Sequence, residues 1–405
     1  MKIVYIHQYF KTPQQSGGTR SYEMARRLVK WGHEVHVVTS WTETSDTKGW
    51  SSQVIEGIHV HWLPVFYNNR MGFSSRLRAF LRFSLKASSK AIALRGDIVF
   101  ASSTPLTIAL PGILASFITR RSLVFEVRDL WPEIPIAMGV LKNSFLIACA
   151  RFLEKFTYRY AAHIVALSPG MARGIESTAV SEDKITIIPN GADLDLFNPE
   201  GIASGIFRRS IPGLSKGPIL LYPGTLGKVN GVEYLVQLAF QVRKLRGDIN
   251  FVVIGDGAER EKVLELASSL GVLNDNFYVF DPMPKEELVF AFRDASLIFS
   301  LIIDLPALEN NSANKFFDAL AAGKAVAINH GGWQKDLIEE HNVGLALSRD
   351  IGVAALSIVE FFQDISRAEA CGQNAYNLAV RGFDRDRLAK LLEKVLLDAC
   401  GKSND

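Results

Sequence analysis

The stretch ENNSANKFFDALAAGKAVAINHGG, residues 309–332, has the pattern of one helix–strand unit of an α/β fold. It starts as a polar, turn-prone run, continues as a short helix, meets Gly323 and then becomes an apolar strand. One polar residue suffices to cap a helix, yet several stand where this helix begins: Asn310, Asn311, Ser312 and Asn314. Followed by Lys315 and Asp318, they predict a helix N-terminus that holds a ligand.

The composition indicates an ordinary globular protein with two domains. The chain has 405 residues, 48% of them hydrophobic, which is enough for two cores of usual size. The cysteines Cys149, Cys371 and Cys400 are scattered without CxxC spacing, which argues against a disulfide framework or a zinc site and fits a reducing cytoplasm. The N-terminal MKIVYIHQYF does not have the pattern of a signal peptide. Prolines interrupt the most apolar window, residues 101–118, which we expect to be a strand plus a helix.

The charge distribution is more informative than the net charge of +3. No acidic residue occurs between Glu56 and Asp97, whereas basic residues are frequent there: Arg70, Arg76, Arg78, Arg82, Lys86, Lys90 and Arg95. Apolar residues are interleaved at mostly helical spacing: Phe73, Leu77, Phe80, Leu81 and Leu85. Such a basic amphipathic helix is typical of proteins that lie on anionic membrane surfaces. The alternative is a surface helix that only packs on its own domain. Nucleic acid is not expected as a partner, because the overall charge is nearly neutral.

Strand and helix patterns alternate along the chain. A first series of apolar runs lies at residues 2–10, 33–40, 58–65, 97–103, 122–129, 163–168 and 184–191. A second series lies at residues 218–227, 250–257, 277–282, 295–301, 325–332 and 344–348. Residues 198–218, rich in Gly, Pro and Ser, separate the two series as a linker. The alternation predicts an α/β fold of two doubly wound, Rossmann-like domains, with a site in a central cleft between them.

Glycine-rich turns follow several of the expected strands and allow backbone N–H groups to approach a phosphate. They contain Gly17 and Gly18, Gly224 and Gly227, and Gly255 and Gly257. None of these turns forms a dinucleotide-binding or P-loop motif, so each alone is better explained as an ordinary turn.

The segment FEVRDLWPE, residues 125–133, ends an expected strand at the cleft. Glu126 and Arg128 alternate along it and are expected on the same face. Arg128 would pair with a phosphate or a sugar, and Asp129 would orient Arg128 or an acceptor hydroxyl. The alternative is a structural Arg–Asp ion pair. His7, at the end of the first strand, is a further candidate, although a lone histidine there more often packs or caps.

The order and spacing of these segments resemble the family-4 retaining glycosyltransferases, which have the GT-B architecture. The resemblance covers nearly the whole chain. Besides residues 309–332 it rests on LVKWGHEVHVVTS (28–40), HIVALSPGMARGI (163–175), KITIIPNGADLDLF (184–197), YPGTLGKVNGVEYLVQLA (222–239) and residues 251–288. It implies an acceptor-binding domain at residues 1–198 that carries the basic helix, a nucleotide-sugar-binding domain at 199–375, and helices at 376–405 that cross back to the N-terminal domain.

The family carries two glutamates eight positions apart, the second of them five positions before a glycine. If Gly323 is that glycine, Asp318 takes the second acidic place and Asn310 the first. The resemblance implies that Asp318 binds the nucleotide ribose. It also implies that Asn310, or Glu309 one position off register, contacts the donor sugar.

The family also has an arginine and a lysine that neutralise the leaving diphosphate. Thr225 and Asn230 occupy these places here, so Lys228 and Lys315 are the available replacements. Catalytic roles are therefore expected for Arg128, Asp129, Lys228, Asn310 and Lys315. Glu126 and His7 are candidates on the acceptor side. Donor binding is expected of a larger set: Gly17, Gly18, Gly224, Thr225, Asn230, Gly255, Asp256, Met283, Glu309, Asn311, Ser312, Asn314 and Asp318.

The N-S-x-N-K pattern of residues 311–315 is similar to that of bacterial O-antigen and capsule N-acetyl-L-fucosaminyltransferases. The implied reaction is retaining transfer of an N-acetylated amino sugar from a nucleotide diphosphate, with UDP expected, to a polyprenyl-diphosphate-linked saccharide. It would take place on the inner face of the bacterial cytoplasmic membrane. No metal and no cofactor are expected, since backbone N–H groups, a helix N-terminus and a lysine would stabilise the leaving diphosphate.

Three other classes of protein agree less well with the sequence. A nucleotide-sugar 2-epimerase on the same architecture would need groups poised for elimination, and only Asp129, Glu126 and His7 are available. A periplasmic-type binding protein would need a signal sequence. A dinucleotide-dependent dehydrogenase would need the fingerprint glycines and an acidic residue about twenty positions later.

Overall fold

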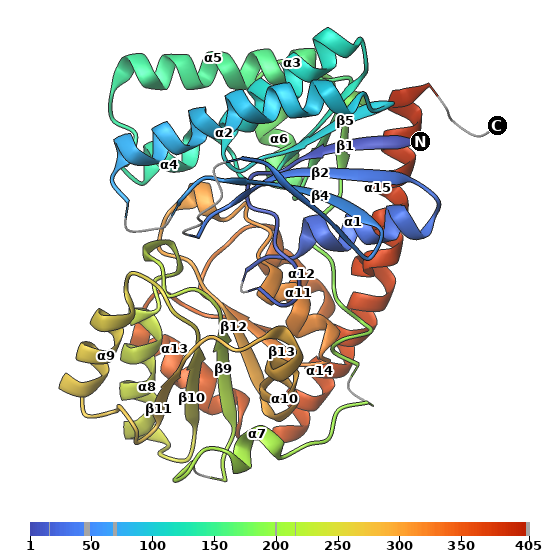
Figure 1. Ribbon diagram of the computed structural model, residues 1–405. Coiled ribbons are helices and arrows are strands. Elements are labelled where there is room, and N and C mark those ends of the chain that lie inside the picture. The colour runs from blue at the N-terminus through green and yellow to red at the C-terminus, as the bar shows by residue number, and fades with distance from the viewer. Residues whose placement is uncertain (16, 44–48, 68–70, 199–200, 215, 402–405) are drawn as a thin grey trace.

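The computed structural model describes residues 1–15, 17–43, 49–67, 71–198, 201–214 and 216–401. Two α/β domains are stacked on one another, with the N-terminal domain uppermost in Figure 1. Arg70 of the basic stretch lies outside the described residues.

The N-terminal domain is built on an eight-stranded sheet in the order β3-β4-β2-β1-β5-β6-β7-β8. Its strands are β1 (Lys2–Ile6), β2 (Glu34–Trp41), β3 (Ser51–Ile55), β4 (Ile58–Pro64), β5 (Ile98–Ser102), β6 (Leu123–Val127), β7 (His163–Ala166) and β8 (Ile185–Ile187). Neighbouring strands pair in parallel, and β3 pairs antiparallel with β4. The helices are α1 (Arg20–Lys30), α2 (Phe73–Leu94), α3 (Ala109–Thr119), α4 (Glu133–Ala137), α5 (Ser144–Tyr160) and α6 (Pro169–Glu176).

The C-terminal domain has a six-stranded parallel sheet in the order β11-β10-β9-β12-β13-β14. Its strands are β9 (Ile219–Pro223), β10 (Asn250–Ile254), β11 (Phe277–Phe280), β12 (Leu297–Ser300), β13 (Ala325–Ile328) and β14 (Gly344–Ala346). The remaining helices are α7 (Ile206–Arg209), α8 (Glu233–Leu245), α9 (Arg260–Ser269), α10 (Lys285–Asp294), α11 (Asn314–Ala321), α12 (Trp333–His341), α13 (Ile351–Phe361), α14 (Ile365–Leu378) and α15 (Arg385–Cys400).

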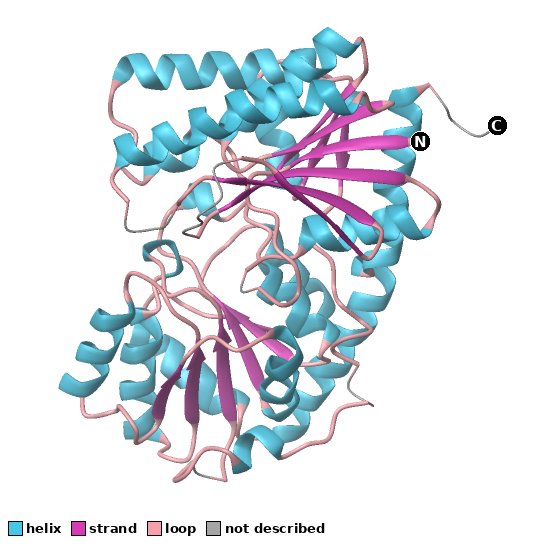
Figure 2. Cartoon of the chain, viewed as in Figure 1, coloured by secondary structure: helices cyan, strands magenta, loops and turns pink. Residues whose placement is uncertain are grey.

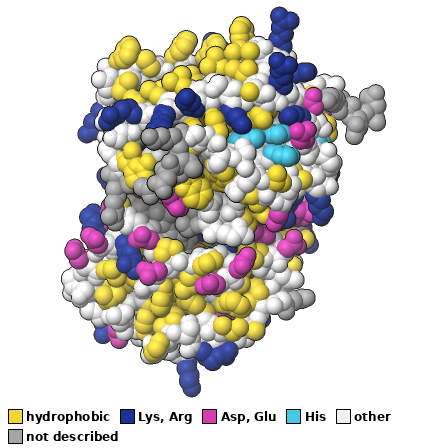
Figure 3. Space-filling model, viewed as in Figure 1, with side chains coloured by type: hydrophobic (Ala, Val, Ile, Leu, Met, Phe, Trp, Pro, Cys, Tyr) yellow, Lys and Arg dark blue, Asp and Glu magenta, His cyan; other side chains and the backbone are white. Residues whose placement is uncertain are grey.

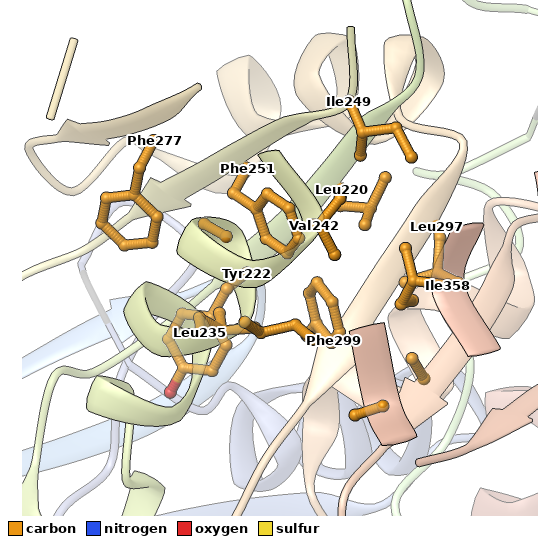
Figure 4. Packing of buried hydrophobic residues seen from close by; sticks show 14 of the residues in the cluster. Leu220, Tyr222, Leu235, Val242, Ile249, Phe251, Phe277, Leu297, Phe299 and Ile358 are labelled. Atoms are coloured by element: carbon orange, nitrogen blue, oxygen red, sulfur yellow. The ribbon is translucent and has the colours of Figure 1, made fainter. Parts of the chain in front are cut away.

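The apolar composition of the central strands explains why they lie inside the domains. Every residue of β9 and β10 is buried, as expected where helices cover both faces of a parallel sheet. Figure 2 shows this layering around both sheets. In the C-terminal core, drawn in Figure 4, the rings of Phe251 and Phe299 stack with their centroids 6.1 Å apart.

In both sheets the first strand lies inside the sheet, with β1 between β2 and β5 and β9 between β10 and β12. The chain therefore reverses direction across the sheet beside these strands, and ligands of doubly wound sheets bind at such points. The prediction of two doubly wound domains is confirmed by these strand orders.

The helix α15 packs against the N-terminal domain, alongside α1 in Figure 1. Its residues Leu388, Leu392 and Leu396 are buried in the same core as Ile3 and Tyr5 of β1. The last long helix therefore joins the core of the first domain.

Three features differ from the expectations or add to them. The exposed strand β3 was not expected, because SSQVI at residues 51–55 has few apolar residues. The predicted linker contains the short helix α7. In the part of the chain that is described, no helix combines the length and the apolarity that crossing a membrane requires.

Candidate active site

A cavity of about 300 Å³ lies where the carboxyl ends of the two sheets meet. It is lined by residues of both domains: His7, Tyr9, Gly18, Thr104, Arg128, Asp129, Leu167 and Asn190 from the first, and Asn311, Ser312, Ala313 and Asn314 from the second. The polar run that precedes α11 therefore forms the wall opposite β1 and β6.

Hydrogen bonds join this polar run to the N-terminal domain. Ser168 Oγ donates to the backbone oxygen of Asn310 at 2.6 Å. The backbone N–H of Asn190 donates to Ser312 Oγ at 3.1 Å, and its side-chain amide donates to the backbone oxygen of Ser312. The two domains thus hold the segment between β12 and α11 from both sides.

The side chain of Asn310 faces helix α6 and does not line the cavity. A Cβ atom on Gly170 would lie 1.8 Å from Asn310 Oδ1, so only glycine fits there. In this arrangement Asn310 contacts the N-terminal domain, and its contact with a donor sugar stays a prediction. Glu309 accepts a hydrogen bond from the backbone N–H of Gly331 at 3.4 Å and lies against Gly331 and Gly332.

Arg128 is held in the cleft by His7. Its Nη1 donates to His7 Nε2 at 3.1 Å, and His7 Nδ1 lies 2.8 Å from Ser21 Oγ. Burial and the charge of Arg128 keep the pKa of His7 well below its usual value. The ring is therefore neutral and carries its proton on Nδ1, since Nε2 accepts from the guanidinium. His7 acts as a support for Arg128, which corresponds to the packing role considered for it.

Asp129 lies beside Arg128 without forming the ion pair considered as the alternative. Among the described residues, Thr104 Oγ1 donates a hydrogen bond to Asp129 Oδ2 at 2.8 Å. Burial raises the pKa of Asp129, while the Thr104 hydrogen bond and Arg128 oppose the increase. The carboxylate therefore keeps hydrogen-bonding capacity at the cavity wall.

Glu126 does not line the cavity, although it lies close enough to Arg128 for the two charges to interact. It is fully buried, forms an ion pair with Arg20 at 2.8 Å and accepts from Ser102 Oγ at 2.6 Å. Burial alone would raise its pKa, but Arg20 and Arg128 hold the pKa of Glu126 below its usual value. Its role is to fix the first strands beneath the site, because a buried carboxylate needs such partners.

Lys315, on the first turn of α11, lies against the first turn of the C-terminal domain. Its Nζ donates to the Tyr222 hydroxyl at 2.9 Å and lies 4.3 Å from the centre of that ring. With the Asn230 amide oxygen facing it, Nζ also donates to Asn230 at 3.3 Å. Burial lowers the pKa of Lys315 to about 7. No carboxylate of the described residues lies within ion-pair distance of Nζ, although half of its charge is present near pH 7.

The glycines of the C-terminal turns allow two loops to pack tightly. A Cβ atom on Gly255 would lie 1.9 Å from the backbone oxygen of Gly224. Gly224 has a φ of +151° and faces the end of the Lys315 side chain, 3.6 Å from the position that a Cβ atom would take. At the other domain, a Cβ atom on Gly18 would lie 2.9 Å from Asn314 Nδ2 across the cleft, whereas Gly17 lies against Lys11.

Asp318 is already paired in this structure. Lys285 Nζ donates to Asp318 Oδ1 at 3.1 Å, and Arg385 lies 3.9 Å from the same oxygen. Lys285 also lies 3.7 Å from Asp193, so these groups form one buried charge cluster. Ribose binding by Asp318 stays a prediction, and Lys285 would share the carboxylate with the ribose.

The other expected residues lie around this centre. Lys228 and Thr225 are exposed, and neither lines the cavity. Asp256 is 4.0 Å from Arg260, and Met283 packs against the C-terminal core. Lys315 is therefore buried beside the turn that follows β9, whereas Lys228 is exposed on that turn.

Two family models cover most of the chain. The Glycosyl transferase 4-like domain matches residues 17–191, and Glycosyl transferases group 1 matches residues 206–378. The two matches follow one another in the order of the two domains. The chain is a GT-B glycosyltransferase of the group 1 family.

Curated relatives of this glycosyltransferase include enzymes of surface polysaccharides. The putative colanic acid biosynthesis glycosyl transferase WcaI of Escherichia coli K12 is 21% identical over 70% of this chain and 74% of its own length. The lipopolysaccharide 1,2-N-acetylglucosaminetransferase of Salmonella typhimurium LT2 is 27% identical over 46% of this chain and 48% of its own length. The aligned segments thus span from about half to three quarters of these relatives.

Solved structures show the same fold. Sucrose-phosphate synthase from Thermosynechococcus elongatus superposes with a TM-score of 0.79 at 17% identity, covering 99% of this chain and 100% of that chain. HepE from Anabaena, in complex with UDP-glucose, gives a TM-score of 0.71 at 16% identity, covering 98% and 100%. The predicted GT-B fold is confirmed by these superpositions. The more specific resemblance to N-acetyl-L-fucosaminyltransferases is not confirmed, and the matched families give no support to the 2-epimerase alternative.

Some site residues of the glycosyltransferase were not expected from the sequence. Tyr222 and Asn190 occur within the quoted motifs YPGTLG and IIPNG. The motifs could have indicated that these residues belong to the site, but not which residues they contact. Thr104 follows β5 without any motif. In the described ranges no group of three His, Cys, Asp or Glu side chains is arranged to hold a metal ion, and metal independence stays an expectation.

Proposed function

We propose that the glycosyltransferase moves an N-acetylated amino sugar from a UDP-linked donor to a lipid-linked saccharide of a surface polysaccharide, such as O-antigen or capsule, with retention of configuration. One observation carries the proposal. Arg128 of the N-terminal domain and the polar start of α11 line the same cavity, and Lys315 follows on the same helical turn. A donor diphosphate and an acceptor would meet between these groups.

The leaving diphosphate is assigned to the N-terminal end of α11. The free N–H groups of this helix and Lys315 supply positive charge where negative charge develops during glycosyl transfer. Lys315 is suited to this role because its ammonium has no carboxylate partner among the described residues. Lys315 then takes the place of one of the family's missing cations, and no metal ion is required by the proposal.

The transfer itself needs no protein nucleophile. The bond between the sugar anomeric carbon and the diphosphate oxygen breaks, and the acceptor hydroxyl oxygen bonds to the same carbon on the same face. The hydroxyl proton passes to the departing phosphate oxygen. Asp129, with free hydrogen-bonding capacity at the cavity wall, would orient the acceptor hydroxyl.

The donor class is supported by the relatives. HepE, which shares the fold, was solved with UDP-glucose. The Salmonella relative is named as an N-acetylglucosamine transferase of lipopolysaccharide. An N-acetyl-L-fucosaminyl donor remains the most specific resemblance of the N-S-x-N-K pattern.

The acceptor side is supported by the outer face of the N-terminal domain. Helix α5 exposes Phe145, Phe152 and Phe156, and α3 exposes Leu114, Phe117 and Ile118. Helix α2 adds Leu81 and Leu85 beside the exposed Arg78, Arg82 and Lys86. Figure 3 shows hydrophobic side chains gathered over the top of this domain, with a row of Lys and Arg side chains below them. We call this surface the three-helix face and propose that it rests on the cytoplasmic side of an anionic membrane.

The donor assignment is tested by calorimetric titration of the protein with UDP, GDP, ADP and TDP. We expect UDP to bind most tightly, and Arg128→Ala to leave most of that affinity because Arg128 lies on the acceptor side. Titration of Lys315→Met should show binding weakened by roughly ten- to a hundredfold, the cost of one charge-assisted contact. Absence of nucleotide binding by a folded sample, or equal binding by Lys315→Met, would contradict the assignment.

A further inference from the structure

A second and larger cavity, of about 700 Å³, lies at the opposite end of the C-terminal sheet. It forms where the turns that lead into β12 and β13 meet α7 and α14. These turns are at the amino ends of the strands, whereas the cleft is at their carboxyl ends. The cavity is therefore separate from the site of sugar transfer.

Lys324 enters this cavity with most of its hydrogen-bonding capacity unused. Its Nζ donates to the backbone oxygen of Arg293 at 2.6 Å, and an ammonium has two further N–H donors. Burial lowers the pKa of Lys324 to about 8. Within the described residues, no carboxylate lies within 4.0 Å of this Nζ.

Arg293, in the last turn of helix α10, also lines this cavity. Its Nε is buried and lacks a hydrogen-bond partner in the structure. A buried donor without a partner is unfavourable, and more so when the group is charged. One cation from the end of α10 and one from the turn before β13 thus line the same cavity, each with N–H groups that lack a partner.

The acidic groups nearby do not supply the missing partner. The carboxylate of Asp294 accepts from the backbone N–H groups of Gly205 and Arg208, at 2.5 and 2.9 Å. Glu369 is exposed at the rim. The cavity is also larger than a single ion needs, and Ala368 and Tyr376 of α14 provide a less polar wall.

We infer that this cavity binds an anion with a phosphate group, held by Lys324 and Arg293, as a second ligand site of the enzyme. A phosphate has several acceptor oxygens that match the unused donors of both side chains. The apolar wall and the spare volume leave room for an organic part, so a phosphate ester fits better than the free ion. This inference does not depend on the proposed donor or acceptor.

The experiment is calorimetric titration of the full chain with inorganic phosphate and, separately, with glucose 6-phosphate. Saturable binding that Lys324→Met weakens at least tenfold, and that Lys315→Met leaves unchanged, is the expected result. Arg293→Met should reproduce the loss. Tighter binding of the ester than of phosphate would identify the organic part as recognised, and equal binding would identify the phosphate group alone.

The matched variants keep the test decisive. Lys324→Met replaces a buried cation by an apolar side chain of similar length, so its thermal midpoint should not fall. Loss of phosphate binding in Lys315→Met alone would place the ion in the cleft and overturn the inference. No saturable binding of either probe by the folded wild-type protein would overturn it as well.

Discussion

At the residue scale, the chemistry of the cleft depends on Lys315, because its charge has no carboxylate to neutralise it among the described residues. Tyr222 contributes a hydroxyl and the face of its ring, which stabilise the ammonium without cancelling its charge. Burial lowers the pKa of Lys315 to about 7. Lys315 is therefore available to bind an anion. A bound diphosphate would raise the pKa of Lys315 again and favour the protonated form.

This arrangement predicts a pH dependence of UDP binding. In the free protein Lys315 loses its proton as the pH rises through about 7. The charged form binds the diphosphate, so the dissociation constant should rise roughly tenfold between pH 7 and 8.5. Lys315→Arg should remove this dependence, because its guanidinium stays charged, and titrations at both pH values measure it. If the dissociation constant of Lys315→Arg depended on pH as that of the wild type does, the titrating group would be a different one.

A second residue-scale prediction concerns Glu154 on α5. Burial and the neighbouring Glu133 raise the pKa of Glu154 to about 7, from 4.5. The folded state thus holds a proton that the unfolded state releases between these values, so stability falls as the pH rises through this range. Glu154→Gln should be more stable than wild type by about 1–3 kcal/mol at pH 8 and by much less at pH 4.5.

Urea denaturation at the two pH values measures the effect of Glu154. Glu133→Gln is the matched control, because it removes the repulsion of Glu154 and only a surface ion pair with Arg151, so its effect should be smaller. A gain for Glu154→Gln that is equal at both pH values would show that the proton is not the cause.

At the scale of elements, the three-helix face combines exposed apolar side chains with basic side chains. The exposed fraction of Leu85 is 72%, that of Phe117 is 70% and that of Phe152 is 70%. Basic residues accompany them, and Glu154, the acidic residue of α5, is buried. Helix α5 thus has one buried face, with Glu154, Thr157 and Tyr158, and one exposed face that carries its phenylalanines.

The three-helix face predicts salt-dependent flotation with anionic vesicles. Each Lys or Arg near such a surface contributes about 1 kcal/mol at moderate salt. The double variant Arg82→Glu/Lys86→Glu should therefore reduce partitioning more than tenfold at low salt, and high salt should weaken the wild type. Phe117→Ser/Phe152→Ser should reduce the binding that persists at high salt. Leu356→Ser, an exposed apolar position on α13, is the control, and a loss equal to that of the Phe variants would refute the assignment.

The sequence predicted the elements whose physical signal is local. Continuous apolar runs such as ILLYP in β9 are typical of covered parallel strands, and each βα unit had its own glycine or polar boundary. Strand β3 was missed because its side chains are exposed and it is held by pairing with β4 alone. The orientation of the Asn310 side chain could not be predicted from the sequence, because it depends on contact with Gly170 in the other domain.

At the scale of the whole molecule, remote segments are joined by one buried charge cluster. Arg385 of α15 forms an ion pair with Asp193 at 2.9 Å and approaches Glu23 of α1 at 3.7 Å. The same Asp193 lies 3.7 Å from Lys285 of the C-terminal domain. Burial alone would raise the pKa of Asp193, but Arg385 and Lys285 hold it below its usual value. No local pattern predicts such a cluster, because its members are brought together only by the finished fold.

The position of α15 predicts a stability effect on the domain that it covers. Leu392 is fully buried in the N-terminal core, whereas the exposed fraction of its neighbour Leu391 is 39%. Leu392→Ala should lower the free energy of unfolding by about 2–4 kcal/mol, and Leu391→Ala by less than about 1 kcal/mol. Hydrogen exchange should place the weakened protection in β1 and α1. Weakening confined to the C-terminal domain would contradict the packing.

Helix α15 also has a consequence for how the protein is made. Contacts such as His33 with Glu393 join residues 360 positions apart in the chain. A ribosome releases β1 early, yet the apolar surface that α15 covers stays open until the last helix has emerged. The C-terminal domain, whose strands follow one another closely, has its own sheet complete before then. The core of the N-terminal domain is therefore completed last, although this domain is synthesised first. Chaperones would bind the domain while one side of its core is still exposed.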